Sequence, residues 1–391
     1  MSISIKDIAR IAGVSHSTVS RALRDSPLVN ADTAEAIRRI AADLGYTPSA
    51  IARGLVHGRT HSLGFVVSRI AHPFMAEVIE AVAARAQDRG YDLIVVGAGD
   101  PQHEVAAVRM LRERRVDGIL VQASRVGEQY TSLLDEIGVP IVLINNQAGG
   151  RTLYAVACDH EAGARLAVGH LLARGHTRIG HLPGPTGAAA AEERQRGWAA
   201  ALRAAGLRAD EALLAPPPAT AWTPEEGVAQ ALDLLRRPAP PTALFCYNDI
   251  AAIGALRAAR MTGRTVPSDL SIVGFDDILL AGFTDPPLTT VAQPKEALGR
   301  TAVEMMLALI EAKETGQKAR EEARDGWDDA LPPPDDGAWR AGAADRIAAL
   351  AEANGATPAD AGTREVLLPP RLVERDSVAS LGAQPTSGAH T

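Results

Sequence analysis

Residues 5–23 read IKDIARIAGVSHSTVSRAL, and this short stretch decides the fold of the N-terminal region. Gly13 can adopt the left-handed backbone of a sharp turn without strain, and Ser15 is a candidate N-cap for the helix that follows. The apolar residues around the turn recur at three- and four-residue spacing, which places them on one face of each helix: Ile5, Ile8, Ala9, Ala12, Val14, Val19 and Leu23. The stretch therefore predicts a helix-turn-helix.

The second helix of this motif carries polar side chains that are suited to DNA. When such a helix enters a major groove, its N-terminal residues meet base edges, and an arginine can bridge guanine O6 and N7. The residues that we expect to face bases are His16, Ser17 and Arg21. Those better suited to phosphate oxygens are Ser15, Thr18, Ser20 and Thr33, and Asn30 at the start of a third helix is a further DNA-binding candidate. A small helical hairpin with a solvated polar face is the alternative that these residues leave open.

Charge is unevenly distributed along the chain. The 391 residues have a formal net charge of −7, which taken alone disfavours a nucleic-acid ligand. Residues 1–60, however, hold eight Lys and Arg against five Asp and Glu, a local balance of +3. This asymmetry is typical of a DNA-binding head attached to an acidic body that stays away from phosphates.

A series of sequence blocks continues in order along nearly the whole chain. After the helix-turn-helix come PSAIARGL at 48–55, SLGFVVS, VPIVLINN, GHTRIGHLPGP, YNDIAAIGAL, DLSIVGFDD, PPLTTVAQP and LLPPRLVERDS. By these blocks the chain resembles the lactose-repressor (LacI/GalR) family of bacterial transcription regulators. Several blocks in a fixed order are far more specific than any one motif.

Residues 48–55 are a candidate hinge helix of about two turns, too short to be stable alone in water. The resemblance implies that two subunits bring their copies of this helix together over the minor groove, where Leu55 wedges between base pairs. Ser49 and Ala52 are the other DNA-binding candidates of this segment. An ordinary interdomain linker is the alternative. The predicted boundaries are 1–48 for the head and 49–60 for hinge helix and linker.

From residue 62 short apolar runs alternate with helical stretches, a pattern that predicts parallel sheets with helices on both faces. The predicted fold class is an all-α helix-turn-helix head followed by an α/β body. The resemblance implies that this body has two lobes, like a periplasmic binding protein. The predicted ranges are 61–159 with 293–315 for the N-terminal lobe, 160–292 with 364–377 for the C-terminal lobe, and 378–391 for a tail.

The resemblance also places a small effector between the lobes, at the carboxyl ends of the strands. The positions that align with the family's effector site are Phe74, Asn145, Arg194, Trp222, Asn248, Asp276 and Lys295. An aromatic face with Arg, Asn and Asp suits a sugar, and charge from Arg194 and Lys295 would also suit an anionic or phosphorylated one. Four of these residues also have a purely structural alternative: a solvated charge for Arg194, a core position for Trp222, a helix cap for Asn248 and a turn for Asp276.

The sequence offers no catalytic or metal-binding set. His176, His181 and Asp276 lie far apart, and neither a nucleophile elbow, a phosphate loop nor Cys and His at metal-ligand spacing appears. We therefore expect no enzyme activity, no metal and no cofactor. Because no export signal or membrane span is apparent, and Cys158 and Cys246 look like buried thiols, we expect a cytoplasmic protein without a membrane partner.

Residues 316–363 depart most from the family, whose members need only a short connection here. The stretch contains LPPPDD, acidic runs and an alanine-rich helical piece near 341–353, a composition that predicts a mobile surface insertion. Trp327 and Trp339 favour the alternative, in which the insertion docks near the lobes or on a partner.

Together these features predict a homodimeric transcription regulator that binds double-stranded operator DNA under the control of a sugar-like effector. Among such regulators, a repressor is favoured. A solute-binding protein of a sugar transport system is the alternative, since it would share the body.

Overall fold

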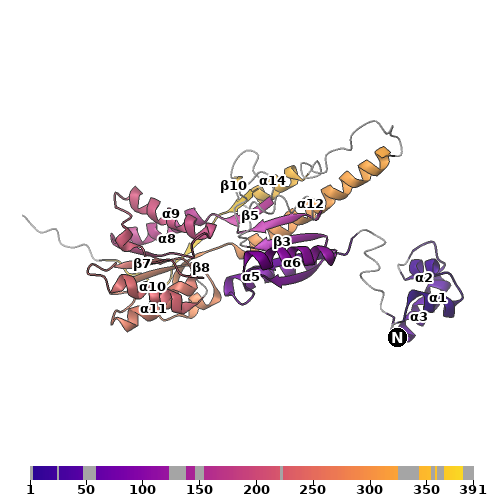
Figure 1. The fold of residues 1–391 in the computed structure, drawn as a ribbon, viewed down its shortest axis with the longest axis horizontal. Coiled ribbons are helices and arrows are strands. Elements are labelled where there is room, and N and C mark those ends of the chain that lie inside the picture. The colour runs from indigo at the N-terminus through magenta and orange to yellow at the C-terminus, as the bar shows by residue number, and fades with distance from the viewer. Residues whose placement is uncertain are drawn as a thin grey trace, which may run out of the picture. The chain divides into compact units, whose positions relative to one another are not determined.

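The computed structural model describes residues 3–23, 26–46, 59–122, 138–145, 154–220, 223–324, 343–353, 357–358 and 365–381. The chain divides into two compact units, Met1–His61 and Ser62–Thr391 (Figure 1).

In the part of the N-terminal unit that the structure describes, three helices surround a small apolar core: α1 (Ile5–Ala12), α2 (His16–Ala22) and α3 (Ala31–Asp43). Gly13 ends α1 with φ 66°, the left-handed conformation expected from its position. Of the predicted apolar set, Ile8, Ala9 and Val19 are buried, and Ile5, Ala12, Val14 and Leu23 are partly buried and pack against the core. Ile37 of α3 is fully excluded from solvent and completes this core. The predicted helix-turn-helix is thereby confirmed.

The first lobe of the body is a seven-stranded sheet of order β10-β11-β5-β4-β3-β1-β2, in which only the β10–β11 pair is antiparallel. Side chains alternate between its two faces: Leu63 and Phe65 belong to the core that includes α5 and α12, and Val66 to the core beneath α6. Its elements are β1 (Ser62–Val67), α5 (Pro73–Asp88), β2 (Asp92–Gly97), α6 (Pro101–Glu113), β3 (Gly118–Gln122), β4 (Ile141–Ile144), β5 (Tyr154–Cys158), α12 (Lys295–Arg324), α14 (Ala344–Ala353), β10 (Thr357–Pro358) and β11 (Glu365–Leu368).

The second lobe is a five-stranded sheet of order β12-β9-β8-β7-β6, in which β12 alone is antiparallel to its neighbour. Ala243 and Phe245 pack with α8 and α9, whereas Leu244 and Cys246 pack with α10 and α11, so helices cover both faces (Figure 1). Its elements are α8 (His160–Ala173), β6 (Ile179–Leu182), α9 (Ala189–Ala204), η1 (Glu211–Leu213), α10 (Pro224–Leu235), β7 (Ala243–Cys246), α11 (Asp249–Met261), β8 (Ser271–Asp276), η2 (Leu279–Phe283), β9 (Thr289–Ala292) and β12 (Arg371–Val373).

The last crossing between the lobes differs from the prediction. Residues 364–377 were assigned as one piece to the C-terminal lobe, but β11 pairs in parallel with β5 in the first sheet, and only β12 joins the second. The reason is burial: Val366 and Leu368 alternate with less buried neighbours and complete the apolar side of β5. The chain therefore crosses at Asp159, at 293–294 and at Pro369 and Pro370.

Within the predicted insertion 316–363, the described residues include the end of one helix and a second helix. α12 continues to Arg324, and α14 packs on it through Ala343, Ile347 and Ala351, all nearly excluded from solvent. An apolar stripe at helical spacing outweighs the polar composition of the surrounding sequence. Trp327 and Trp339 lie outside the described residues.

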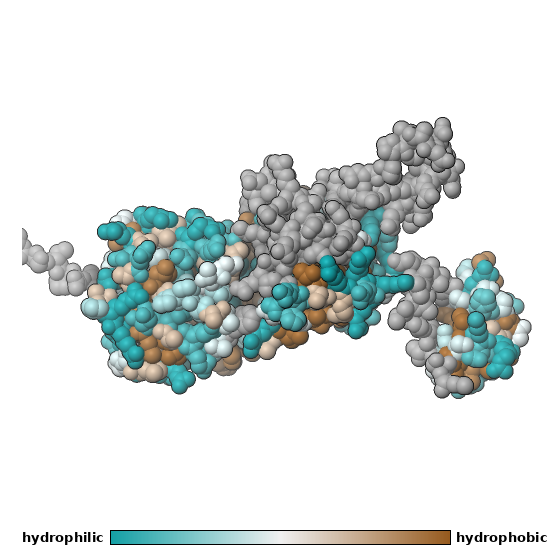
Figure 2. Space-filling view, viewed as in Figure 1, coloured by the Kyte–Doolittle hydropathy of each residue, from teal (hydrophilic) through white to brown (hydrophobic). Residues whose placement is uncertain are grey.

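Past the last strand, residues 377–381 lie against the second lobe. Ser377 Oγ donates to the Ile272 carbonyl at 2.6 Å and accepts from the Thr289 amide at 2.8 Å, and Val378 is buried beside β8. The predicted tail therefore begins as part of the core. The visible surface of this lobe mixes polar residues with smaller apolar areas (Figure 2).

Candidate functional site

The outward face of α2 carries the residues predicted to face DNA bases. His16, Ser17 and Arg21 are exposed, whereas Val19 and Ala22 of the same helix are buried against its neighbours. The split follows from helical periodicity, and it leaves a polar face that is narrow enough to enter a major groove.

Except for Ser20, the predicted phosphate-contacting residues lie in or just before the first turn of α2 or α3. Ser15 Oγ accepts from the Thr18 amide at 3.1 Å and lies 2.7 Å from Ser17 Oγ. Asn30 caps α3 in the same way, because its Oδ1 accepts from the Thr33 amide at 2.8 Å. Ser20 is half-buried. The caps orient the first turns of α2 and α3, where backbone amides point outward and favour anions. Ser49, Ala52 and Leu55 lie outside the described residues.

In the body, Arg194 of α9 is the centre of a buried polar network, with only 3 % of its surface exposed. Its guanidinium donates to the Tyr247 carbonyl, and Nη2 lies 3.5 Å from Asp276 Oδ1 and 3.3 Å from His160 Nδ1. The ring of Phe275 lies 3.7 Å from the guanidinium carbon and that of Tyr247 lies 4.6 Å from it. Arg194 is therefore not a solvated charge; its orientation is set from several sides.

A directional chain of hydrogen bonds runs from Asp276 into the first lobe. Gln293 Nε2 donates to Asp276 Oδ1 at 2.7 Å, and Asn145 Nδ2 donates to Gln293 Oε1 at 2.9 Å. Asn145 Oδ1 in turn accepts from the Cys158 amide at 3.0 Å. Asn145 and Cys158 stand at the ends of β4 and β5, whereas Asp276 and Gln293 stand at the ends of β8 and β9. The network thus joins the carboxyl ends of strands from both lobes.

Asp276 and the residue after it adopt strained backbone conformations, with φ 113° for Asp276 and 52° for Asp277. The fully buried Asp249 stabilises this turn, because its Oδ2 accepts from the Ile278 amide at 2.9 Å and its Oδ1 from Thr290 Oγ1 at 2.5 Å. Burial raises the pKa of Asp276, and the neighbouring Arg194 acts against that rise.

Lys295 bridges the two lobes. Its Nζ donates to the Asp277 carbonyl at 2.5 Å and lies 2.6 Å from Glu77 Oε2 on α5, with 15 % of the lysine side chain exposed. The ammonium group predicted to bind effector is thus already engaged by a carboxylate and a carbonyl.

Of the remaining predicted effector residues, the structure describes Phe74 and Asn248 but not Trp222. Phe74 is buried in the first turn of α5. Asn248 is the N-cap of α11 and accepts from the Ala251 amide at 2.8 Å, the structural role that the sequence left open. Trp222 lies outside the described residues.

Sequence reasoning missed four members of the network: His72, His160, Tyr247 and Gln293. His72 occupies the N-cap position of α5 without a side-chain capping hydrogen bond, and burial lowers its pKa, although Asp276 acts in the opposite direction. Burial lowers the pKa of His160 well below its usual value, as does the nearby Arg194. A polar residue just after a strand or just before a helix was the available signal, but many such residues only cap helices.

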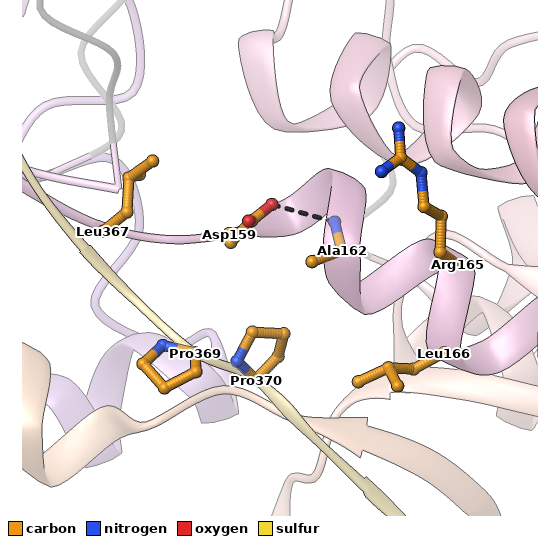
Figure 3. A pocket seen from close by; sticks show the side chains of 7 residues that line it. All are labelled: Asp159, Ala162, Arg165, Leu166, Leu367, Pro369 and Pro370. Carbon is orange, nitrogen blue, oxygen red and sulfur yellow. Dashed lines mark hydrogen bonds between the residues drawn. The ribbon is translucent and has the colours of Figure 1, made fainter. Parts of the chain in front are cut away.

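A separate pocket of about 280 Å³ lies where two of the chain crossings meet α8. It is lined by Asp159, Ala162, Arg165, Leu166, Leu367, Pro369 and Pro370 (Figure 3). Asp159 Oδ1 accepts a hydrogen bond from the Ala162 amide at 2.8 Å. None of the polar residues of the Arg194 network lines this pocket, so the two are distinct features of the body.

His176 and His181, which form no catalytic set in the sequence, are buried in the second lobe. His176 Nε2 is 2.9 Å from Ser271 Oγ, and His181 stacks on Phe245. Across the described residues, no group of three or more His, Cys, Asp and Glu is placed to hold a metal ion. Among those residues, too, there is no helix of the length and apolarity that a membrane span requires.

Family descriptions match both units of the chain. Residues 4–49 match bacterial regulatory proteins of the lacI family, and residues 168–324 match a periplasmic binding protein-like domain.

Curated relatives match along most of their length. The HTH-type transcriptional repressor PurR of Vibrio atlanticus is 36% identical over 315 residues, which cover 80% of this chain and 93% of the relative. The HTH-type transcriptional repressor CytR of Escherichia coli K12 is 34% identical over 319 residues, covering 81% and 92%.

Solved structures match the whole architecture. The lac repressor dimer bound to operator and the anti-inducer ONPF superposes with a TM-score of 0.76 at 26% identity, covering 97% of this chain and 100% of that one. The complex of the transcriptional regulator CelR with cellobiose gives 0.64 at 28% identity, with 96% and 99% covered.

Proposed function

The chain belongs to the lacI family of bacterial regulatory proteins, and we propose that it is a transcriptional repressor whose operator affinity is controlled by an effector held between its lobes. The observation that carries this proposal is the pairing of an exposed polar face on α2 with a buried polar network that joins two lobes. Its curated relatives PurR and CytR are transcriptional repressors and not enzymes. Access to chromosomal DNA implies a cytoplasmic location.

On DNA, the base edges face His16, Ser17 and Arg21, while the phosphates are contacted by Ser15, Thr18, Ser20 and Thr33. Asn30, the N-cap of α3, is a further DNA-binding residue. The exposed donors of α2 and the basic balance of residues 1–60 support these roles. The hinge candidates Ser49, Ala52 and Leu55 would complete the contact in the minor groove.

In the body, the effector lies against Phe74, Asn145, Arg194, Asn248 and Asp276, with Trp222 as a further candidate. These residues approach from both lobes, so binding changes how firmly the lobes hold each other. The effector and the operator then alter each other's affinity, typically by about 1–3 kcal/mol. A sugar suits the mixture of amide, carboxylate and aromatic groups, as does another compact molecule with several polar edges.

A homodimer is supported by an apolar patch on the second lobe. Leu279, Leu280 and Phe283 of η2 are 74%, 50% and 79% exposed, and Met261 at the end of α11 is 58% exposed. The two segments are adjacent, because Arg260 donates to the Asp285 carbonyl. Clustered exposed apolar residues mark an interaction surface, and a second copy of the chain would place two heads on a two-fold symmetric operator.

The proposal is tested by selecting duplexes from a random DNA library with the purified protein and measuring gel shifts on the preferred site with and without candidate small molecules. We expect a near-palindromic site, binding that weakens steeply with salt, and an affinity that changes when one compound is added. A solute-binding protein would bind the compound without preferring any duplex. Absence of any preferred site would overturn the proposal.

A further inference from the structure

The electrostatics of the Arg194 network point to the charge of its effector, an inference that rests on the function proposed above. Arg194 faces the carboxylate of Asp276 at 3.5 Å, and both side chains are at least 95% buried. Its terminal nitrogens are engaged by Tyr247, Asp276 and His160. The positive charge is therefore compensated before any ligand arrives.

Lys295 is compensated in the same way. Glu77 Oε2 lies 2.6 Å from its Nζ, and the Asp277 carbonyl takes a further donor. Asp277 itself is paired with Arg375 at 2.7 Å. Arg69, on the exposed loop after β1, is close enough to His72 to help lower the pKa of that histidine. The positive charges of Arg194 and Lys295 are already balanced by carboxylates, so an anion entering here would add a buried negative charge that no cation balances, which is costly.

Uncompensated hydrogen-bonding groups remain in the network. Among the described residues, His72 Nδ1, His160 Nε2 and Arg194 Nε are buried without a hydrogen-bond partner. Arg194 only donates, so His160 Nδ1 accepts from it, and the proton of this neutral ring lies on Nε2. Arg194 Nε and His160 Nε2 are thus both donors that lack an acceptor, and buried donors are rarely left so.

We propose that the effector of this chain is an uncharged molecule that offers hydrogen-bond acceptors, such as hydroxyl, carbonyl or ring-nitrogen atoms, to this network, and not a phosphorylated or otherwise anionic one. Lys295 is then a positioning residue that ties α5 of the first lobe to the turn after β8, through Glu77 and the Asp277 carbonyl.

The first test is calorimetric titration of the full-length protein with matched pairs: ribose and ribose 5-phosphate, glucose and glucose 6-phosphate, adenosine and adenosine 5′-monophosphate. For any pair that binds, we expect the phosphorylated member to bind about tenfold or more weakly than the uncharged member. We expect this ratio of affinities to change little between low and moderate salt. Tighter binding of a phosphorylated member would overturn the proposal.

The second test needs no knowledge of the effector, since it uses inorganic phosphate as the probe. Glu77→Gln removes the carboxylate from Lys295, so this variant should gain a saturable rise in Tm with phosphate at constant ionic strength, which the wild type should lack. Glu80→Gln, which changes an exposed acid on the same helix, is the matched control and should behave like the wild type. A saturable phosphate response in the wild type that equals that of Glu77→Gln would contradict the compensation argument.

The two proposals fail in different ways. If the wild type selects no duplex, the repressor function fails, whatever the phosphate measurement gives. If it selects a site but its effector proves anionic, only the inference about charge fails.

Discussion

Asp276 shows how the backbone at the end of a strand turns a single side chain towards the Arg194 network. The φ angles are 113° at Asp276 and 52° at Asp277. A positive φ costs a residue other than glycine about 1–3 kcal/mol. Asp249 holds the Ile278 amide on one side of this turn, and Arg375 and Lys295 hold Asp277 on the other. The strain is therefore opposed by buried hydrogen bonds, and it aims the Asp276 carboxylate at Arg194.

Arg21 is the residue from which we expect the clearest change in DNA specificity. Its exposed guanidinium is the side chain of α2 best suited to a bidentate contact with guanine, so Arg21→Ala should cost about 1–3 kcal/mol of discrimination at one position of the half-site. Competition gel shifts with singly substituted duplexes measure this loss. Arg39→Ala, on the outer side of α3 where Arg39 pairs with Glu35, is the control. Equal loss at every base position would show that Arg21 contacts phosphate instead.

Glu193 should make stability depend on pH. Burial raises its pKa from the ordinary 4.5 to about 7, although Arg196 and Arg194 oppose the rise. The folded protein thus keeps a proton that the unfolded chain releases, so this group stabilises the fold fully below about pH 4.5, and the contribution is lost as pH rises through about 7. The loss is about 3 kcal/mol at most.

Glu193→Gln should remove this dependence, because the amide has no charge to bury. Urea denaturation between pH 5 and pH 8 should show a steeper fall in unfolding free energy for the wild type than for the variant. Glu192→Gln, at the exposed neighbouring position, is the control and should follow the wild type. Parallel pH profiles for the wild type and Glu193→Gln would disprove the argument.

At the scale of elements, α14 shows a helix whose place is decided by a few apolar contacts. Ile347 is 4% exposed and packs with α12, and Arg346 pairs with Glu311 of that helix. Removing this isoleucine leaves a cavity in the contact between α14 and α12, whereas the polar side of α14 has little to lose.

Ile347→Ala should therefore lower the unfolding free energy by about 2–4 kcal/mol and expose α14 to proteases. Limited proteolysis with mass spectrometry would detect early cleavage within 343–353. Glu352→Ala, at an exposed position of the same helix, should leave both properties close to the wild type. Rapid cleavage of α14 in the wild type would contradict the packed arrangement.

For the molecule as a whole, the proposed function requires two heads that act together on one operator. The apolar patch of Met261, Leu279, Leu280 and Phe283 offers the surface through which two bodies would pair. Phe283 is its most exposed member, at 79%. A carboxylate at this position would be buried without a partner in such an interface, which is strongly unfavourable.

We accordingly expect Phe283→Asp to sediment as a monomer at concentrations where the wild type is a dimer, and to lose most of its operator affinity while still binding effector. Sedimentation velocity and gel shifts measure the two effects. Leu166→Asp changes an exposed apolar residue of α8, away from η2, and should preserve the dimer. If both variants stay dimeric, the interface lies elsewhere.

Local sequence patterns by themselves determined the head and the strand–helix alternation of the body. The turn at Gly13, the caps at Ser15 and Asn30, and the apolar periodicity act between residues a few positions apart, so they can be read from the chain directly. The family's sequence blocks indicated Arg194, Asp276 and Asn145 as neighbours, and the structure places these three in one network.

The pairing of charged and polar side chains, in contrast, is visible only in the three-dimensional structure. Lys295 and Glu77 are 218 positions apart, and Gln293 and Asn145 are 148 apart, so their pairing arises from the crossing of the chain between lobes. The same holds for β11, whose place beside β5 follows from burial of Val366 and Leu368. Contacts between distant residues depend on how whole sheets close their cores, and no local pattern encodes that geometry.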